Sequence, residues 1–340
     1  MSEQHPYCIP PVLCGTPRPL WSVMIPTYNC ANYLRETLAS VLAQDPGPDV
    51  MQIEVVDDCS TQDDPAAVVE ELGRGRVVFY QQPKNVGNTR NYQTCLERSR
   101  GKLIHLLHGD DCVRDGFYRK MLLAFENPEI GAAFCRTINM DEHSHWHSIF
   151  PLEQSESGVL SNWLERIAVE QRIRTPSVVV RRDVYEKIGA FDQRLLYIED
   201  WEMWVRIAAH YPVWYEVEPL ALYRNRRPGS LSERSVYTSE LFREIRRAIE
   251  IAHSYVPDPI VAAELSKKAR ENWAILALNT AREMIVKGNV AAATTQLQEA
   301  LKCSHSLRVI NSTLQFVRWA GKRWLWQTAR TAVSFNVKNT

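Results

Sequence analysis

The chain has 340 residues, of which 45% are hydrophobic and 24% charged, as is ordinary for a globular protein with a main domain and a smaller one. Its 40 basic residues balance its 40 acidic residues, so no global charge favours nucleic acid as a partner. The cysteines are scattered and form no Cys-x-x-Cys pair, and the first residues resemble neither a signal nor a transit peptide. No apolar run is long enough to span a membrane. These features together predict a cytoplasmic protein.

The first third of the chain alternates between the patterns of strands and helices. Residues 1–20 are rich in proline and predict an extended arm. The patterns that follow predict strands at 21–25, 52–56, 76–81 and 103–107, and helices at 32–44, 64–72 and 88–100. Gly101 is placed at the end of the third helix. This alternation indicates an α/β fold with a mostly parallel sheet and right-handed crossovers.

Unusual polar residues follow these strands. They form the segments Pro26-Thr27-Tyr28-Asn29, Asp57-Asp58, Lys84-Asn85-Val86-Gly87 and Asp110-Asp111. The carboxyl ends of parallel strands share one edge of a sheet, where ligands bind. A carboxylate of Asp57-Asp58 can accept a hydrogen bond from a nucleobase; the alternative is that residues of this segment cap the next helix. Tyr28 can stack on the nucleobase; the alternative is that its ring only packs the loop.

Asp110 and Asp111 are the most informative pair. Adjacent carboxylates repel each other unless a cation or a hydrogen-bonding ligand group lies between them. The oxygen-preferring ions Mg²⁺ and Mn²⁺ suit such a pair, and a solvated turn is the alternative. Neither of the glycine-rich phosphate-binding motifs occurs in the sequence. A bound diphosphate would therefore need a metal and basic side chains, for which Lys84, Arg90 and the run 224–227 are candidates unless that run is a solvated loop.

The middle of the chain contains a predicted hairpin or loop at 141–158, a short helix at 184–188 and an amphipathic helix at 199–210. Glu199-Asp200-Trp201 opens that last helix, where the acids either complement the helix dipole or supply a general base. Beyond residue 237 the pattern is wholly helical. Its end mixes tryptophans with arginines, which predicts either contact with an anionic membrane surface or packing within the chain or a homo-oligomer.

Four segments occur in a characteristic order. They are Ile25-Pro26-Thr27-Tyr28-Asn29, Val55-Val56-Asp57-Asp58-Cys59-Ser60-Thr61, His108-Gly109-Asp110-Asp111 and Glu199-Asp200-Trp201-Glu202. Together they resemble the family 2 glycosyltransferases, which have the nucleotide-sugar-binding GT-A fold. The resemblance covers about residues 20–235 and implies a GT-A domain at 21–236. With the proline-rich arm at 1–20 and the helical region at 237–340, this predicts three parts of the chain.

The resemblance also implies roles for individual residues. Pro26, Thr27, Tyr28 and Asp58 would hold the nucleoside, with Arg90 nearby. Asp110 would contact the ribose side, and Asp111 would ligate Mn²⁺ or Mg²⁺ on the diphosphate. Asp200 would deprotonate the acceptor hydroxyl, with inversion at the anomeric carbon. Contacts with the acceptor or the diphosphate are expected from Glu199, Trp201 and Arg227.

The implied donor is a nucleoside-diphosphate sugar, with a UDP-sugar expected, and the implied acceptor is a saccharide or a lipid-linked molecule. The expected location is the cytoplasm or, with a lipid-linked acceptor, the inner face of the membrane. The sequence departs from the family pattern at two positions. His108 replaces the first acid of the Asp-x-Asp motif, and Arg227 stands before Pro-Gly-Ser where many relatives carry histidine. A sugar nucleotidyltransferase and a non-catalytic nucleotide-sugar-binding relative are the alternatives.

Overall fold

The structure is a computed structural model that describes residues 7–225, 229–235 and 237–337. The chain divides into two compact units. The first contains Met1–Ile167 and Gln171–Ser230, and the second contains Ala168–Glu170 and Leu231–Thr340. That the chain folds as separate domains meeting after residue 236 stays a prediction.

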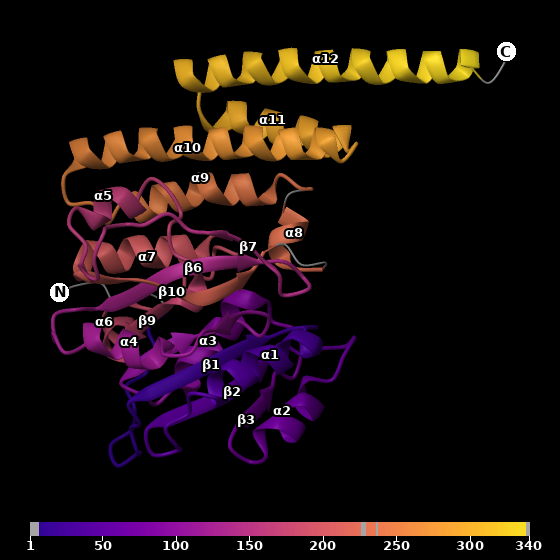
Figure 1. Cartoon of the computed structure of the whole chain (residues 1–340). Helices are drawn as coiled ribbons and strands as arrows, with labels where there is room; N and C mark the ends of the chain where they lie inside the picture. Colours follow the sequence, from indigo (N-terminus) through magenta and orange to yellow (C-terminus); the bar gives the residue numbers. More distant parts are fainter. Residues whose placement is uncertain (1–6, 226–228, 236, 338–340) are drawn as a thin grey trace. The chain divides into compact units, whose positions relative to one another are not determined.

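The described strands of the first unit form one ten-stranded sheet in the order β3-β2-β1-β4-β9-β6-β10-β5, with β7 and β8 paired to β6 and β10. Figure 1 labels β1, β2 and β3 at one end of this order and β6 and β10 toward the other. The first four strands are mutually parallel where they pair: β1 (Trp21–Thr27), β2 (Met51–Asp57), β3 (Val78–Gln81) and β4 (Leu103–Leu106). Their carboxyl ends therefore meet at one edge, as the sequence predicted.

The rest of the sheet is mixed. It contains β5 (Cys112–Val113), β6 (Ala132–Met140), β7 (Trp146–Ile149), β8 (Gly158–Val159), β9 (Val178–Arg181) and β10 (Val213–Arg224). Strand β9 runs antiparallel to both β4 and β6, whereas β6 and β10 are parallel. The predicted α/β class with a mostly parallel central sheet is confirmed, and β7 forms the expected hairpin with β6.

Helices connect the strands of this unit. They are α1 (Ala31–Leu42), α2 (Pro65–Gly73), α3 (Asn88–Arg98), α4 (Phe117–Ala124), α5 (Trp163–Ile167), α6 (Arg182–Ile188) and α7 (Glu199–His210), with a 3₁₀ turn at Thr175–Ser177. Helix α2 begins as its sequence suggests, because the Asp64 side chain accepts from Ala67 N and Pro65 occupies the first turn.

The expectation for Gly101 was wrong. Helix α3 ends at Arg98, and its C-cap is Ser99 in an extended conformation. A Cβ atom on Gly101 would lie 2.5 Å from Ser22 N, closer than real Cβ contacts allow. The glycine therefore permits close approach to β1 instead of ending the helix.

The described part of the proline-rich arm is bound to the rest of the first unit. Tyr7 O accepts from Ala190 N at 2.8 Å, and Pro10 O accepts from Arg182 Nη2 at 2.7 Å. Ile9 between them is buried, with 3% of its surface exposed. The arm thus has specific contacts although it forms neither a helix nor a strand.

The second unit is helical, as predicted. It contains α8 (Leu231–Ser235), α9 (Glu240–His253), α10 (Pro259–Val286), α11 (Val290–Cys303) and α12 (Leu307–Val337). Helices α10, α11 and α12 pack around a small apolar cluster that includes Met284, Ala293 and Phe316. No helix among the described residues combines the length and apolar character that crossing a bilayer requires.

Candidate active site

The end of β1 presents one exposed aromatic ring beside buried polar groups. Pro26 and Thr27 are buried, whereas Tyr28 just beyond the strand has 43% of its surface exposed. The Thr27 hydroxyl donates to Asp57 Oδ1 at 3.4 Å and so links β1 to β2. An exposed ring at this position can stack on a flat ligand.

The two acids at the end of β2 are both buried, and each has a structural partner. Asp57 accepts hydrogen bonds from the backbone N–H and the hydroxyl of Ser60. Asp58 accepts from the backbone N–H groups of Val86 and Gly87 at 2.7 and 2.9 Å. Burial raises the pKa of the Asp58 carboxyl above its ordinary value, and these two amides oppose the shift. Each carboxylate oxygen can accept a further hydrogen bond, so Asp58 retains acceptor capacity for a ligand.

The turn after β4 lies directly on the end of β1. Gly109 N donates to Pro26 O at 3.0 Å. A Cβ atom on Gly109 would lie 2.3 Å from Thr27 Cγ2, so only glycine permits this approach. The structure therefore brings the Asp110-Asp111 pair to the edge that also carries Tyr28, as the sequence predicted.

Asp111 is the buried member of this pair, and Asp110 is only partly buried. Asp111 Oδ1 accepts from Arg224 N at 2.7 Å, whereas its Oδ2 accepts no hydrogen bond from any described residue. His108 Nδ1 is 3.4 Å from that Oδ2, and His108 Nε2 is 2.8 Å from the Tyr92 hydroxyl. Burial raises the pKa of Asp111 to about 6. Burial also opposes protonation of His108, but the Asp111 carboxylate leaves the pKa of His108 raised.

These residues fit a divalent cation. His108, Asp110 and Asp111 each offer one ligand atom, and these atoms lie within 4.8 Å of one another. Asp111 Oδ2 is buried, accepts no hydrogen bond from a described residue and has His108 Nδ1 3.4 Å away, so a positive charge beside it would be favourable. Carboxylates suit both Mg²⁺ and Mn²⁺, while an imidazole ligand favours Mn²⁺ of the two. The histidine that departs from the family pattern is thus placed where it can serve as a ligand.

The expectation that Arg224 supplies positive charge to a diphosphate was wrong. Its side chain is buried, and its guanidinium donates to Asp110 O, Asp141 O, Ser144 Oγ and Glu36 Oε2 at 2.9–3.0 Å. With its donors bound to protein oxygens, Arg224 fixes the turn that carries the acidic pair.

Glu199 and Asp200 open α7 with different surroundings. Glu199 is buried and accepts from Asn88 Nδ2 at 2.8 Å. Asp200 is partly exposed; its Oδ1 accepts from Trp201 N at 2.7 Å, and the Thr175 hydroxyl lies 3.5 Å from its Oδ2. Burial raises the pKa of Asp200, and the positive charge of Arg174 opposes the shift. Asp200 is therefore the more accessible proton acceptor of the two.

Trp201 does not face the site as expected. It is fully buried, and its indole N–H donates to Ile167 O at 2.7 Å. The structure places this side chain in the core, where it packs α7 against the fold instead of contacting a substrate.

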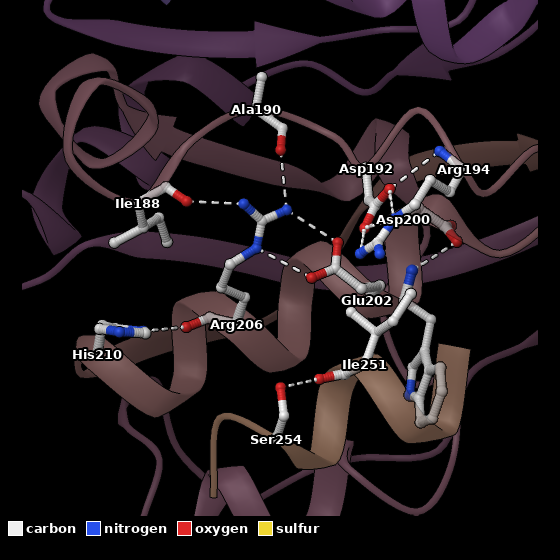
Figure 2. A network of polar contacts seen from close by, with 11 residues as sticks. Ile188, Ala190, Asp192, Arg194, Asp200, Glu202, Arg206, His210, Ile251 and Ser254 are labelled. Atoms are coloured by element: carbon white, nitrogen blue, oxygen red, sulfur yellow. Dashed lines mark hydrogen bonds and ion pairs between the residues drawn. The ribbon is translucent and has the colours of Figure 1, made fainter. Parts of the chain in front are cut away.

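Helix α7 is anchored by a buried ion pair. Figure 2 shows Arg206 bonded to Glu202 and to the carbonyl oxygens of Ile188 and Ala190. Both charged side chains are almost fully buried, so each compensates the other. Glu202 and Arg206 follow Asp200 in the same helix, within its first two turns, so the pair fixes the helix that carries Asp200.

Two predicted cationic contacts have different outcomes. Arg90 is exposed in the first turn of α3, directly after the loop that Asp58 holds. Arg227 lies outside the described residues, so its contact with a diphosphate stays a prediction. Sequence reasoning missed Arg224 and Tyr92 as supports of the acidic turn. Arg224 was visible in the sequence only as part of the basic run 224–227, which does not indicate a buried support, and no sequence signal was available for Tyr92.

The comparisons with known proteins agree with this geometry. The family model described as Glycosyl transferase family 2 matches residues 22–189, which run from β1 to α6 and contain three of the four ordered segments named in the sequence analysis. The chain belongs to glycosyl transferase family 2. It is a glycosyltransferase, which decides between the two enzyme classes that the sequence left open.

Proteins of similar sequence occur in several bacteria. An uncharacterized protein of Mycobacterium tuberculosis is 30% identical over 220 residues, covering 61% of this chain and 68% of that relative. An uncharacterized glycosyltransferase of Rickettsia prowazekii is 24% identical over 321 residues, covering 89% and 97%.

Among solved structures, residues 1–349 of TarS from S. aureus superpose with a TM-score of 0.61 at 14% identity, covering 90% of this chain and 91% of that one. The mannosyltransferase PcManGT of Pyrobaculum calidifontis superposes with a TM-score of 0.55 at 16% identity, covering 95% and 87%. These likenesses confirm the predicted GT-A fold of family 2.

Proposed function

We propose that this enzyme transfers a sugar from a nucleoside-diphosphate sugar to a hydroxyl group of a saccharide or lipid-linked acceptor, with inversion at the anomeric carbon. The observation that carries the proposal is the convergence of Tyr28, Asp58 and the Asp110-Asp111 turn at one sheet edge. TarS has been solved with UDP-GlcNAc and with UDP, and PcManGT with GDP-Man and Mn²⁺, which supports a nucleotide-sugar donor.

The nucleoside would bind at the ends of β1 and β2. Tyr28 offers its exposed ring for stacking, and Asp58 offers its remaining lone pairs to a base N–H. Pro26 and Thr27 shape the floor of this position, and Arg90 lies on the adjoining helix α3. A UDP-sugar is the expected donor.

The diphosphate would bind beside the turn after β4. Asp111 would hold the divalent cation with Asp110 and His108, and Asp110, as the more exposed acid, would also face the ribose. A cation held there would stabilise the charge that develops on the departing nucleoside diphosphate.

Asp200 would act as the general base. It takes the proton of the acceptor hydroxyl while that oxygen bonds to the anomeric carbon and the bond from that carbon to the diphosphate oxygen breaks. Its partly exposed position at the start of α7 leaves it reachable, and the anchored helix holds it in place.

The donor is tested by thermal shift with a panel of nucleotide sugars, with and without Mn²⁺. We expect one nucleotide sugar to raise the unfolding midpoint, and more so with Mn²⁺. Transfer to a saccharide panel, followed by NMR of the product, then reports the anomeric configuration. Retention would contradict the inverting mechanism, and absence of any nucleotide-dependent shift would contradict the donor class.

We also propose that α12 contacts an anionic membrane surface near a lipid-linked acceptor. Residues 307–337 contain basic but no acidic side chains. Within the described side chains of α12, Leu307, Ile310, Leu314 and Val317 are exposed on the helix that also exposes Arg318. Each basic residue near such a surface contributes about 1 kcal/mol.

Flotation with anionic vesicles tests the membrane contact, with neutral vesicles and a 1–305 truncation as controls. Salt-sensitive binding that the truncation loses supports it. If the full-length enzyme ignores vesicles while the truncation changes its oligomeric state, α12 packs against another copy instead.

A further inference from the structure

Arg174 is an arginine whose side chain is held in place without a hydrogen-bonding partner for its head group among the described residues. Its guanidinium carbon lies 5.0 Å from the ring centroid of Phe150 and 5.3 Å from that of Tyr223. The three residues come from separate segments: the stretch after β7, the residue before the 3₁₀ turn, and strand β10. The two rings therefore fix the guanidinium through cation–π contacts.

Its N–H groups are not used within the described part of the chain. Nε is buried and has no acceptor, and no described residue accepts a hydrogen bond from either terminal nitrogen. The other partly or fully buried arginines of this unit behave differently. Arg182, Arg206 and Arg224 each donate to several carbonyl or carboxylate oxygens. A donor without an acceptor is unfavourable, so an acceptor supplied by a ligand would be stabilised at this guanidinium.

Arg174 also lies next to the general base. Thr175 follows it directly, and the Thr175 hydroxyl is 3.5 Å from Asp200 Oδ2. However, no nitrogen of Arg174 forms an ion pair with a described carboxylate. An arginine placed beside the base but not paired with it can present its planar fork to a substrate.

We propose that Arg174 binds an oxyanion, a phosphate or carboxylate group, that a substrate carries to the vicinity of Asp200. The proposal rests on the proposed function for the identity of the base, and it adds a recognition element to that site. The oxyanion belongs either to the diphosphate of the donor or to an anionic group of the acceptor. Both present the flat pair of oxygens that an arginine fork binds through two hydrogen bonds.

The full-length variants Arg174→Gln and Arg174→Lys test this by calorimetric titration with inorganic phosphate, UDP and uridine. Arg174→Gln should weaken the affected anion by about 10- to 100-fold, since charge-assisted hydrogen bonds are lost. Arg174→Lys keeps the charge without the fork and should give a smaller loss. Uridine carries no phosphate, so its affinity should not change.

These titrations distinguish the two possible sources of the oxyanion, the donor diphosphate and the acceptor. Weaker binding of UDP with unchanged binding of uridine assigns Arg174 to the donor diphosphate. Unchanged binding of UDP, with phosphate binding at saturating UDP lost, assigns it to an anionic acceptor group. The matched control is Arg172→Gln, because Arg172 lies two residues away and pairs with Glu153.

The proposal is overturned if neither anion weakens, or if Arg172→Gln weakens them equally. It is also overturned if Arg174→Gln and Arg174→Lys both lower the unfolding midpoint strongly while a folded fraction binds phosphate normally, because Arg174 would then be a packing residue. Failure of the wild-type enzyme to bind any nucleotide would contradict the proposed function. The phosphate titration without nucleotide would still report on Arg174.

Discussion

The Asp110-Asp111 turn and the start of α7 both carry two adjacent acids, and in both the fold treats the two acids differently. Asp111 and Glu199 are buried and accept hydrogen bonds from Arg224 N and Asn88 Nδ2, whereas Asp110 and Asp200 are partly exposed. In the acidic turn the buried Asp111 is the main candidate metal ligand, whereas at the start of α7 the partly exposed Asp200 is the candidate base. Burial therefore suits one acid to holding a cation, and exposure suits the other to accepting a proton.

The two pairs differ in what compensates their charge. Asp111 has a buried oxygen that accepts no hydrogen bond from a described residue, and its pKa is raised to about 6 by burial, so this pair favours an added cation. Asp200 lies at a helix start, with Arg174 nearby as a counter-charge. The first pair is suited to binding a metal, and the second is suited to accepting a proton.

Replacing Asp200 and Glu199 one at a time should have the largest effect and tests which acid at the start of α7 is the base. Asp200→Asn should lower turnover by about 10²- to 10⁴-fold with donor affinity nearly unchanged, because it removes a general base and little binding energy. Glu199→Gln keeps an acceptor for Asn88 and should have a much smaller effect. The measurement is kcat and KM for both variants. A severe Glu199→Gln with a mild Asp200→Asn would reverse the assignment within the pair.

The next prediction removes the buried ion pair that anchors α7, the helix that carries Glu199 and Asp200. Arg206→Met leaves Glu202 buried without its partner, so we expect the free energy of unfolding to fall by about 3–5 kcal/mol. Urea denaturation measures it. The double variant Arg206→Met with Glu202→Leu is the control and should recover much of the loss. If the single and double variants are equally stable, the ion pair does not anchor α7.

The strand that supports the first pair should respond to pH. His105 on β4 is buried, stacks on Phe117 and contacts Pro176 O at 3.0 Å; burial lowers its pKa to about 4. The unfolded chain takes up this proton near pH 6.5, before the folded enzyme does. The free energy of unfolding should therefore fall by about 3 kcal/mol from pH 6.5 to pH 4 because of this residue.

The control for that pH dependence is His105→Phe, which keeps an aromatic ring but cannot titrate. It should be less stable than wild type at pH 7, since Pro176 O loses its partner. Its stability should also fall less steeply between pH 6.5 and pH 4. Identical slopes for the two proteins would show that His105 titrates normally in the fold.

Asp111→Asn gives the smallest of these effects. It removes a ligand charge while keeping an acceptor for Arg224 N, so Mn²⁺ affinity and turnover should fall by about 10- to 100-fold with the fold intact. Asp115→Asn, at an exposed position four residues later, is the matched control. The metal role is abandoned if wild-type turnover persists in excess EDTA.

Much of the first unit could be predicted from sequence because its signals are local. The spacing of apolar residues in strands and helices, the N-cap of α2 at Asp64 and the polar residues at the strand ends can all be recognised from neighbouring positions in the sequence. The outcomes for Gly101, Trp201 and Arg224 could not be read in this way. Each depends on contact with a distant segment: Ser22, Ile167 and the turn of Asp110. The antiparallel direction of β9 likewise depends on its partners and not on its own residues.

The docked N-terminal arm bears on how the enzyme should be produced. The match to the family begins at residue 22, so trimming the chain to that point looks harmless. It would nevertheless remove Ile9 from its buried position and leave Arg182 Nη2 without the Pro10 carbonyl, a loss of about 1–3 kcal/mol for the unsatisfied donor alone. A recombinant enzyme should therefore retain the residues from Tyr7 onward, and an affinity tag is better placed on a linker before them.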